Sequence, residues 1–204
     1  MLRTLGSALK STAMCDNRFA RAPSLKNVVV LMYGLMRSST PLPGLQQNLL
    51  NPFKAAGIKV DMFMHTYIQG VCNMPDGLEV SSSQGLRAIR EEISSVQMFT
   101  TPICEAMDAM NDALSRCDRG RRNWKYGWTR QLYVRHMLQL YSLQEVTALA
   151  VRQAQVCKDT IIVRYRPDTI IDCPILPNTV IGKLGQKDML VPLVKTRQNI
   201  VNDR

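Results

Sequence analysis

Apolar residues along this chain form three strand-like runs, and each run ends in polar residues. The runs cover residues 28–32, 59–64 and 160–163. Val, Ile, Met and Phe fill most of their positions, which is typical of strands that are covered on both faces of a sheet. The pattern therefore predicts three buried strands that come from distant parts of the chain.

A helix is predicted between the first two strands. Leu45, Leu49 and Phe53 recur at helical spacing, and Gly57 is suited to end the helix. Pro52 lacks a backbone donor, so we expect it to shorten or kink the helix. A strand–helix–strand unit predicts a right-handed crossover between parallel strands, and the predicted fold class is therefore α/β.

The stretch from Tyr67 to Lys158 is predicted to be mostly helical and to form a long insertion before the third strand. Helix starts are predicted at the serines 81–83, at Thr101-Pro102 and at the capping box Ser142-Leu-Gln-Glu145. The first of these helices would bury Leu86, Ile89, Ile93 and Val96. After Asp172 the sequence predicts loops and short strands, with residues 190–194 as one such strand.

Composition divides the chain into a leader and a body. Residues 1–25 are rich in Ser, Thr, Ala and Arg, which is typical of an organelle transit peptide or of a flexible basic tail. Residues 26–204 form the α/β domain, and their abrupt end suggests a domain that is incomplete at its C-terminus. No apolar run approaches the roughly 18 residues of a membrane span, and none resembles a secretory signal. The expected location is cytoplasmic or, with a transit peptide, organellar.

The protein is strongly basic, with a formal net charge of +10 and a pI of about 9.6. Such an excess favours anionic partners such as phosphates, nucleotides or nucleic acid. Within residues 116–135, Arg and Lys are interleaved with Trp124, Tyr126 and Trp128. This basic stretch can bind single-stranded nucleic acid, cover a phosphate-bearing substrate as a lid, or form a solvated loop between helices.

Six cysteines occur in the chain, and no two of them form a Cys-x-x-Cys pair. With only two histidines present, this spacing does not fit a structural zinc site. The mostly apolar surroundings of the cysteines favour reduced, buried thiols over a disulfide framework.

Polar residues follow each predicted strand. Gly34 and Arg37 follow the first strand, His65 and Thr66 end the second, and an Arg-Pro-Asp block at 166–168 closes the third. Because ligands bind outside the carboxyl ends of strands in open α/β sheets, we expect these residues to line one crevice. Arg37 can pair with a phosphate through its planar fork. His65 can contact a ligand or act as a base near neutral pH, or it can be a hydrogen-bonded core histidine.

Arg166 and Asp168 have two interpretations. They can form an ion pair, since a buried arginine needs a carboxylate partner. Alternatively, Asp168 can contact a ribose, a sugar or a phosphate-bound divalent cation, with Asp172 as a second carboxylate ligand. In an extended chain every second side chain points to the same side, so Arg164 would lie on the same side as Arg166 and Asp168. The chain contains no Walker loop, Gly-x-Gly-x-x-Gly, Gly-x-Ser-x-Gly or His-Glu-x-x-His motif.

Five short blocks, taken in order, resemble a family of poorly characterised glycosyltransferase-like proteins. The resemblance covers roughly residues 26–204 and depends on the order and spacing of the blocks. The blocks are Gly34 with Arg37, Asp61-Met-Phe-Met-His65-Thr-Tyr67, Tyr141-Ser-Leu143, Arg166-Pro-Asp168 and Asn202-Asp-Arg204.

The resemblance implies a GT-A-like fold, in which helices flank a Rossmann-like, mostly parallel sheet. It also implies sugar transfer from a nucleotide-sugar donor to an unidentified acceptor, with a divalent cation (Mn or Mg) as cofactor. The residues implied are His65 and Asp168 for catalysis, Gly34, Arg37, Thr66 and Arg166 for donor or phosphate binding, Asp168 and Asp172 for the metal, and Asp203 as a further candidate. The Asp-x-Asp signature that is usual in that fold is absent from this chain. Two alternatives stay open: a degenerate, non-catalytic interaction module of the same fold, and a basic nucleic-acid-binding protein.

Overall fold

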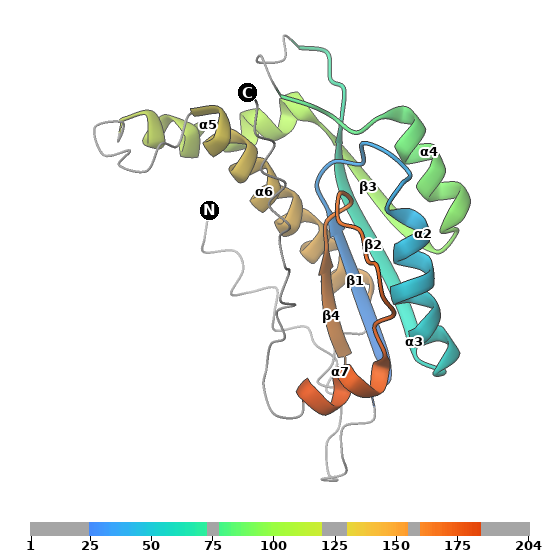
Figure 1. Cartoon of the computed structure of the whole chain (residues 1–204). Coiled ribbons are helices and arrows are strands. Elements are labelled where there is room, and N and C mark those ends of the chain that lie inside the picture. The colour runs from blue at the N-terminus through green and yellow to red at the C-terminus, as the bar shows by residue number, and fades with distance from the viewer. Residues whose placement is uncertain (1–24, 73–77, 120–129, 155–159, 185–204) are drawn as a thin grey trace, which may run out of the picture.

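The computed structural model describes residues 25–72, 78–119, 130–154 and 160–184, and it shows an α/β fold around a four-stranded sheet (Figure 1). The strand order is β3-β2-β1-β4, and all three pairings are parallel, as in a Rossmann-like fold. The strands are β1 (Asn27–Tyr33), β2 (Lys59–Ile68), β3 (Val96–Pro102) and β4 (Thr160–Tyr165). The three strands predicted from apolar runs are therefore confirmed, and the sheet holds a fourth.

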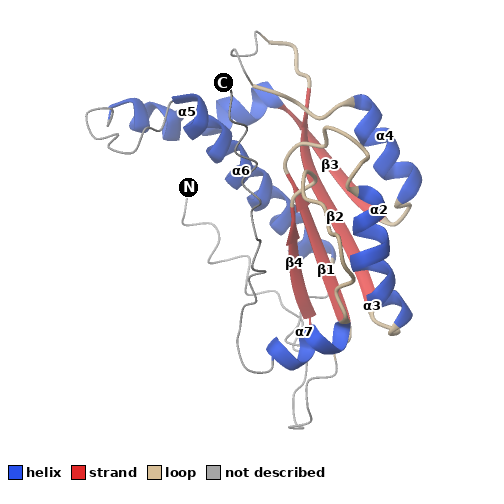
Figure 2. Ribbon diagram, in the orientation of Figure 1, coloured by secondary structure: helices blue, strands red, loops and turns tan. Residues whose placement is uncertain are grey.

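Helices cover both faces of the sheet, which explains why the central strands are mostly apolar (Figure 2). Every residue of β1 except Tyr33 is buried. Alternate side chains of β1 and β2 point to opposite faces, and the register Val30↔Met62 and Leu31↔Phe63 keeps each face apolar. Parallel strands buried on both sides are the structure that the continuous apolar runs predict.

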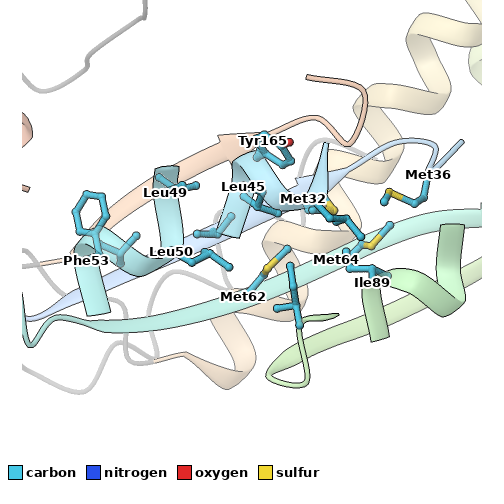
Figure 3. Close-up of a cluster of buried hydrophobic side chains, with 14 of the residues drawn as sticks. Met32, Met36, Leu45, Leu49, Leu50, Phe53, Met62, Met64, Ile89 and Tyr165 are labelled. Carbon is cyan, nitrogen blue, oxygen red and sulfur yellow. The ribbon is translucent and has the colours of Figure 1, made fainter. Parts of the chain in front are cut away.

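The larger core lies between the sheet and a first layer of helices (Figure 3). This layer contains α2 (Leu42–Leu45), a π-helical turn η3 (Gln46–Leu50), α3 (Asn51–Ala55) and α4 (Ser83–Glu92). Ser82 caps α4 by accepting a hydrogen bond from the Gly85 N–H at 3.0 Å, which confirms a cap within the predicted serine run. The side chains at the centre of this core include Met32, Leu45, Leu49, Phe53, Met62, Met64 and Ile89.

The helical segment continues through Pro52 to Ala55 after the π-helical turn η3, and the carbonyl that proline leaves without a donor has another partner. Proline cannot donate to the Asn48 carbonyl four residues earlier. That carbonyl instead accepts a hydrogen bond of 2.7 Å from the Ile175 N–H. The Asn48 side chain also donates to the Ile171 carbonyl at 2.6 Å. These two bonds to Asn48 fasten the chain that follows β4 to this layer.

The opposite face of the sheet is covered by α6 (Arg130–Gln153), which packs with α5 (Ile103–Arg119). Val146 and Ala150 of α6 lie on Val29, Leu31 and Phe63 of the sheet. A third cluster joins α5 and α6 to the end of β2 and includes Tyr67, Ile103, Val134 and Leu138. Together these contacts hold α6 across the carboxyl ends of β1 and β2.

Two predictions in the helical stretch are wrong. Val96 does not belong to the predicted helix: α4 ends at Glu92, and Val96 begins β3. Ser142 does not begin a helix either, because α6 runs through it without a break. The run Val-Gln-Met-Phe-Thr-Thr, which begins at Val96, has the composition of a strand. It was not recognised because Val96 also continues the helical spacing of Leu86, Ile89 and Ile93. The Ser142 hydroxyl bonds to another element instead of capping its own helix.

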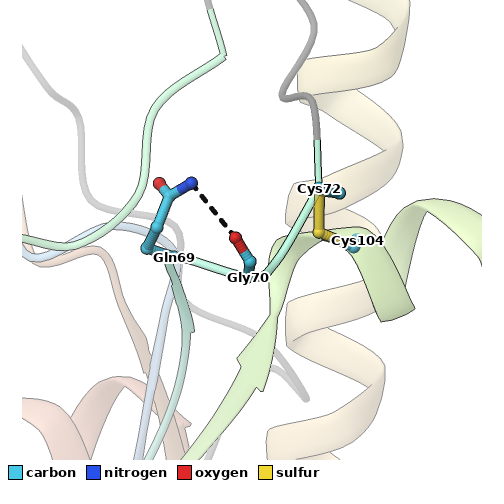
Figure 4. Close-up of a disulfide and its surroundings, with 4 residues drawn as sticks. All are labelled: Gln69, Gly70, Cys72 and Cys104. Atoms are coloured by element: carbon cyan, nitrogen blue, oxygen red, sulfur yellow. Dashed lines mark hydrogen bonds between the residues drawn. A yellow bond between two sulfur atoms is a disulfide. The ribbon is translucent and has the colours of Figure 1, made fainter.

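Cys72 and Cys104 form a disulfide, so the expectation of reduced thiols is wrong for this pair (Figure 4). Their Cα atoms lie 6.2 Å apart. Cys72 follows β2 and Cys104 lies in the first turn of α5, just after β3. Because β2 and β3 pair up to Ile68↔Pro102, the two cysteines follow neighbouring strand ends. Without β3, the sequence offered no reason to bring them together.

A final helix, α7 (Pro177–Leu184), lies where loops and short strands were expected. The leader up to residue 24, the strand predicted at 190–194 and most of the aromatic part of the basic stretch lie outside the described residues. Within the described residues, no helix combines the length and the apolar character needed to cross a membrane.

Candidate functional site

A hollow lies at the carboxyl edge of the sheet, where the chain leaves β1, β2 and β4. Its empty volume, which includes space open to solvent, is about 610 Å³. This is the edge at which open α/β sheets bind their ligands. The residues that line the hollow are Tyr33, Gly34, Leu35, Arg37, Tyr67, Leu78, Glu79, Arg135, Leu138, Gln139, Arg166, Pro167 and Asp168.

Gly34 forms the turn by which the chain leaves β1. Its φ of +107° lies in a region that residues with a Cβ rarely adopt. The Gly34 N–H donates to the Ser142 hydroxyl at 3.1 Å and, more weakly, to the His65 carbonyl at 3.3 Å. The turn is thus fixed by β2 and α6, and it directs the following residues, up to Arg37, along the hollow.

Four charged residues form a chain of alternating sign across the hollow. Arg166 binds Asp168 through two bonds, Nε to Oδ1 at 3.0 Å and Nη2 to Oδ2 at 2.6 Å. Arg37 Nη1 lies 3.9 Å from the same Oδ2, and Arg37 Nε donates to Glu79 at 2.6 Å. The structure therefore brings the predicted residues Arg37, Arg166 and Asp168 together. It also shows the ion pair that was one of the two interpretations of Arg166 and Asp168.

This pairing keeps Asp168 ionised. Burial alone would raise the pKa of the Asp168 carboxyl, but the hydrogen bonds and charge of Arg166, helped by Arg37, lower it overall. The hydrogen bond to Asp168 in turn raises the pKa of the Arg166 guanidinium. Three guanidinium groups and two carboxylates line the hollow, so its formal charge is positive.

His65 lies beneath the hollow rather than in its wall. Its side chain is completely buried, and the ring contacts the rings of Tyr67, Phe99 and Tyr141. Burial lowers the pKa of the His65 imidazole from 6.5 to about 4, so the ring is neutral at physiological pH.

The hydrogen bonds around His65 fit a single arrangement of protons. The Ser142 hydroxyl donates its only proton to the His65 carbonyl at 3.0 Å. The Ser142 oxygen then accepts from His65 Nδ1–H at 2.8 Å, in addition to the Gly34 N–H. With Nδ1 protonated, Nε2 of the neutral ring accepts from the Thr101 hydroxyl at 2.9 Å. His65 therefore links β2 with β3, α6 and the turn at Gly34.

The other predicted site residues do not line the hollow. Thr66 is buried and bonds to the Ser81 hydroxyl, which also accepts from the Met36 N–H at 2.7 Å. Asp172 is exposed and is not part of the lining, and Asp203 lies outside the described residues. The turn after Gly34 is thus held by Thr66 through Ser81, without contact between Thr66 and the hollow.

The described residues do not fit a divalent cation at Asp168. Both carboxylate oxygens accept hydrogen bonds from Arg166, and a second guanidinium lies nearby. A Mn or Mg ion needs oxygen ligands that face it, and positive neighbours repel it. Within the described part of the chain, no group of three His, Cys, Asp or Glu residues is arranged to hold a metal.

Sequence reasoning missed several lining residues. Tyr67 ends β2, and its hydroxyl donates to the Leu138 carbonyl of α6 at 2.6 Å. Its position at the end of a predicted strand could have identified Tyr67 as a lining residue. Arg135 stood out only as part of the basic stretch, and nothing in the sequence pointed to Glu79 or Gln139. Arg135 and Gln139 reach the hollow from α6, and Glu79 reaches it from the segment before α4.

Comparisons with protein-family models, with curated proteins and with solved structures find no significant match to this chain. The arrangement of charges at the carboxyl edge of the sheet is therefore the basis for a functional proposal.

Proposed function

We propose that this protein is a glycosyltransferase that binds a nucleotide-sugar donor in the hollow at the carboxyl edge of its sheet. One observation carries the proposal: Gly34, Arg37, Arg166 and Asp168, from two distant parts of the chain, meet in one hollow. The five sequence blocks that resemble glycosyltransferase-like proteins support the same activity.

In this proposal the arginines hold the phosphates of the donor. Planar guanidinium groups bind phosphate oxygens in pairs of parallel hydrogen bonds. During transfer the bond between the sugar carbon and the diphosphate breaks, and a bond to an acceptor oxygen forms. Fixed positive charge stabilises the diphosphate as it leaves. The acceptor proton goes to Glu79, since both oxygens of the other lining carboxylate, Asp168, accept from Arg166.

His65 contributes to this site by position. Both ring nitrogens are used within the protein, and the ring is buried. Its carbonyl and its bond to Ser142 hold the N–H of Gly34, the residue that opens the hollow. His65 is therefore a positioning residue, while the arginines and Asp168 face the donor.

A panel of nucleotide sugars tests this proposal by thermal unfolding and by release of nucleoside diphosphate, each with and without Mn²⁺. We expect at least one donor to stabilise the protein, by about 2–3 kcal/mol at 100 times its Kd. Arg37→Gln should abolish most of this stabilisation. Arg164→Gln, an equal change of charge on an exposed residue outside the hollow, should not. Failure of every donor to stabilise the protein would contradict the proposal.

A second candidate is a transferase fold that binds its ligand without transferring sugar. The engagement of both Asp168 oxygens by Arg166 and the burial of His65 favour it. Stabilisation by a nucleotide sugar without release of nucleoside diphosphate, in the presence of any acceptor tried, would support this candidate over the enzyme. The nucleic-acid alternative depends on the basic stretch, of which residues 120–129 lie outside the described residues.

A further inference from the structure

Two arginines in the hollow approach the same oxygen atom. Arg166 Nη2 lies 2.6 Å and Arg37 Nη1 lies 3.9 Å from Oδ2 of Asp168. The two guanidinium groups come from the segments that follow β4 and β1, which are neighbouring strands. Because both groups reach one point, a single anion at that point would contact both of them.

Both arginines can still bind a ligand from solvent. A guanidinium carries five N–H donors. Asp168 takes Nε and Nη2 of Arg166, and Glu79 takes Nε of Arg37. The side chains of Arg166 and Arg37 are 45% and 55% exposed. An incoming anion with more charge than a carboxylate can therefore compete for both groups.

A divalent cation would have to lie among these same groups. Its proposed ligand, Asp168, is held by one guanidinium and approached by a second. At such distances two positive groups repel a cation strongly, because screening is weaker than in bulk water. The charge that a metal would supply to a diphosphate is already present as arginine.

We infer that the hollow binds the diphosphate of its ligand without a divalent cation, with Arg37 and Arg166 as the cationic groups and Asp168 as an internal counter-ion that the diphosphate replaces. The inference rests on the proposed function in taking a diphosphate as the ligand. It differs from the metal-dependent arrangement that the sequence resemblance implies. Here Asp168 competes with the diphosphate for the arginines, whereas in that arrangement Asp168 would bind the metal.

Inorganic pyrophosphate is the probe, and titration calorimetry of the full chain in EDTA is the measurement. We expect binding in EDTA that added Mg²⁺ or Mn²⁺ does not strengthen. Arg166→Gln and Arg37→Gln should each weaken it by about 10-fold or more, the usual effect of losing a charged hydrogen bond. Arg164→Gln, a change on β4 two residues before Arg166, should bind like the unmodified protein, which controls for general attraction to a basic protein.

Asp168→Asn separates the two roles of this residue. As a counter-ion, Asp168 competes with pyrophosphate for the arginines, so its neutralisation should leave binding unchanged or tighten it several-fold. As a metal ligand, its neutralisation would weaken binding and abolish any response to Mn²⁺. Circular dichroism and the urea midpoint of each variant show whether it is folded, and the two arginine variants provide independent readings should one fail to fold.

Several results would overturn the inference: no pyrophosphate binding in EDTA, binding that requires a divalent cation, loss of binding in Asp168→Asn, or equal binding by the Arg166 and Arg164 variants. A nucleotide sugar that binds only with Mn²⁺ would overturn it and leave the sugar-transfer proposal intact. Conversely, pyrophosphate binding in EDTA without stabilisation by any nucleotide sugar would support the inference and contradict sugar transfer.

Discussion

Burial decides what the titratable side chains of this protein can do. His65 lies in β2 and Asp168 follows β4, and both were predicted to be catalytic residues. His65 is enclosed by aromatic rings and has hydroxyl partners on both ring nitrogens. Asp168 stays partly exposed among guanidinium groups. One is therefore a neutral structural group and the other an ionised group that faces the hollow.

The depressed pKa of His65 predicts a loss of stability in mild acid. The unfolded chain takes up a proton near the ordinary pKa of 6.5, whereas the folded ring resists protonation until about pH 4. Stability from this group is therefore complete above pH 6.5 and is lost as the pH falls towards 4. The loss should reach about 3 kcal/mol, from about 1.36 kcal/mol per pH unit.

Urea unfolding at several pH values between 7 and 4 measures this effect. His65→Gln keeps an uncharged polar side chain and should remove the part of the pH dependence that lies in this window. Loss of the Asp168 pairing, since the pKa of that carboxyl is lowered, belongs to more acid solutions and does not overlap. An equal pH dependence in the variant and the unmodified protein would refute the assignment to His65.

Helix α6 contributes residues to a site whose other residues lie far from it in the sequence. It packs on β1 and β2 through Val146 and Ala150, and Ser142 adds a fixed point by bonding to His65 and to Gly34. Apolar packing has no preferred direction, whereas these hydrogen bonds set the position of the helix along the strands. Arg135, Leu138 and Gln139 reach the hollow because of that position.

Ser142→Ala should destabilise the protein by about 2–3 kcal/mol, because His65 Nδ1 then loses its buried partner and Gly34 N–H keeps only the longer bond to a carbonyl. Thr147→Val removes another hydroxyl from the same helix. Among the described residues, that hydroxyl bonds to the nearby Leu143 carbonyl of its own helix, so its loss should cost less than about 1 kcal/mol. Free energies of unfolding in urea measure both, and equal costs would argue against a special role for Ser142.

At the scale of the whole molecule, the disulfide acts on the unfolded chain. Cys72 and Cys104 are 32 residues apart in sequence, and the link closes a loop that contains α4 and β3. A loop of this length lowers the entropy of the unfolded state and adds about 3–4 kcal/mol of stability in the chain-entropy model. Structural disulfides persist in oxidising compartments, which makes the redox state of this pair informative about where the protein works.

Dithiothreitol should therefore lower the urea midpoint of the unmodified protein. The double variant Cys72→Ser/Cys104→Ser should start at the lower midpoint and not respond to reductant. Cys173 is an exposed free thiol, so Cys173→Ser should behave like the unmodified protein. Labelling of Cys72 or Cys104 by a thiol reagent in the native protein, without prior reduction, would show that the pair is not linked.

The sequence by itself determined the elements whose pattern comes from neighbouring residues. Continuous apolar runs predicted β1, β2 and β4, and glycine predicted the end of the first helical segment. The rule that parallel strands end at one edge correctly placed Gly34, Arg37, Arg166 and Asp168 together. Alternation in β3 was lost because it follows a helix whose periodicity extends by chance to Val96.

Only the tertiary structure decided which partners these residues meet. His65 and Ser142 are 77 residues apart, and Arg37 and Glu79 are 42 apart. Local periodicity carries no record of such contacts, because they depend on how α6 and the segment before α4 pack on the sheet. The same packing buries His65, which therefore has a structural role, and pairs Asp168 with arginine. Burial and charged partners, rather than residue type, set the chemistry of an ionisable group.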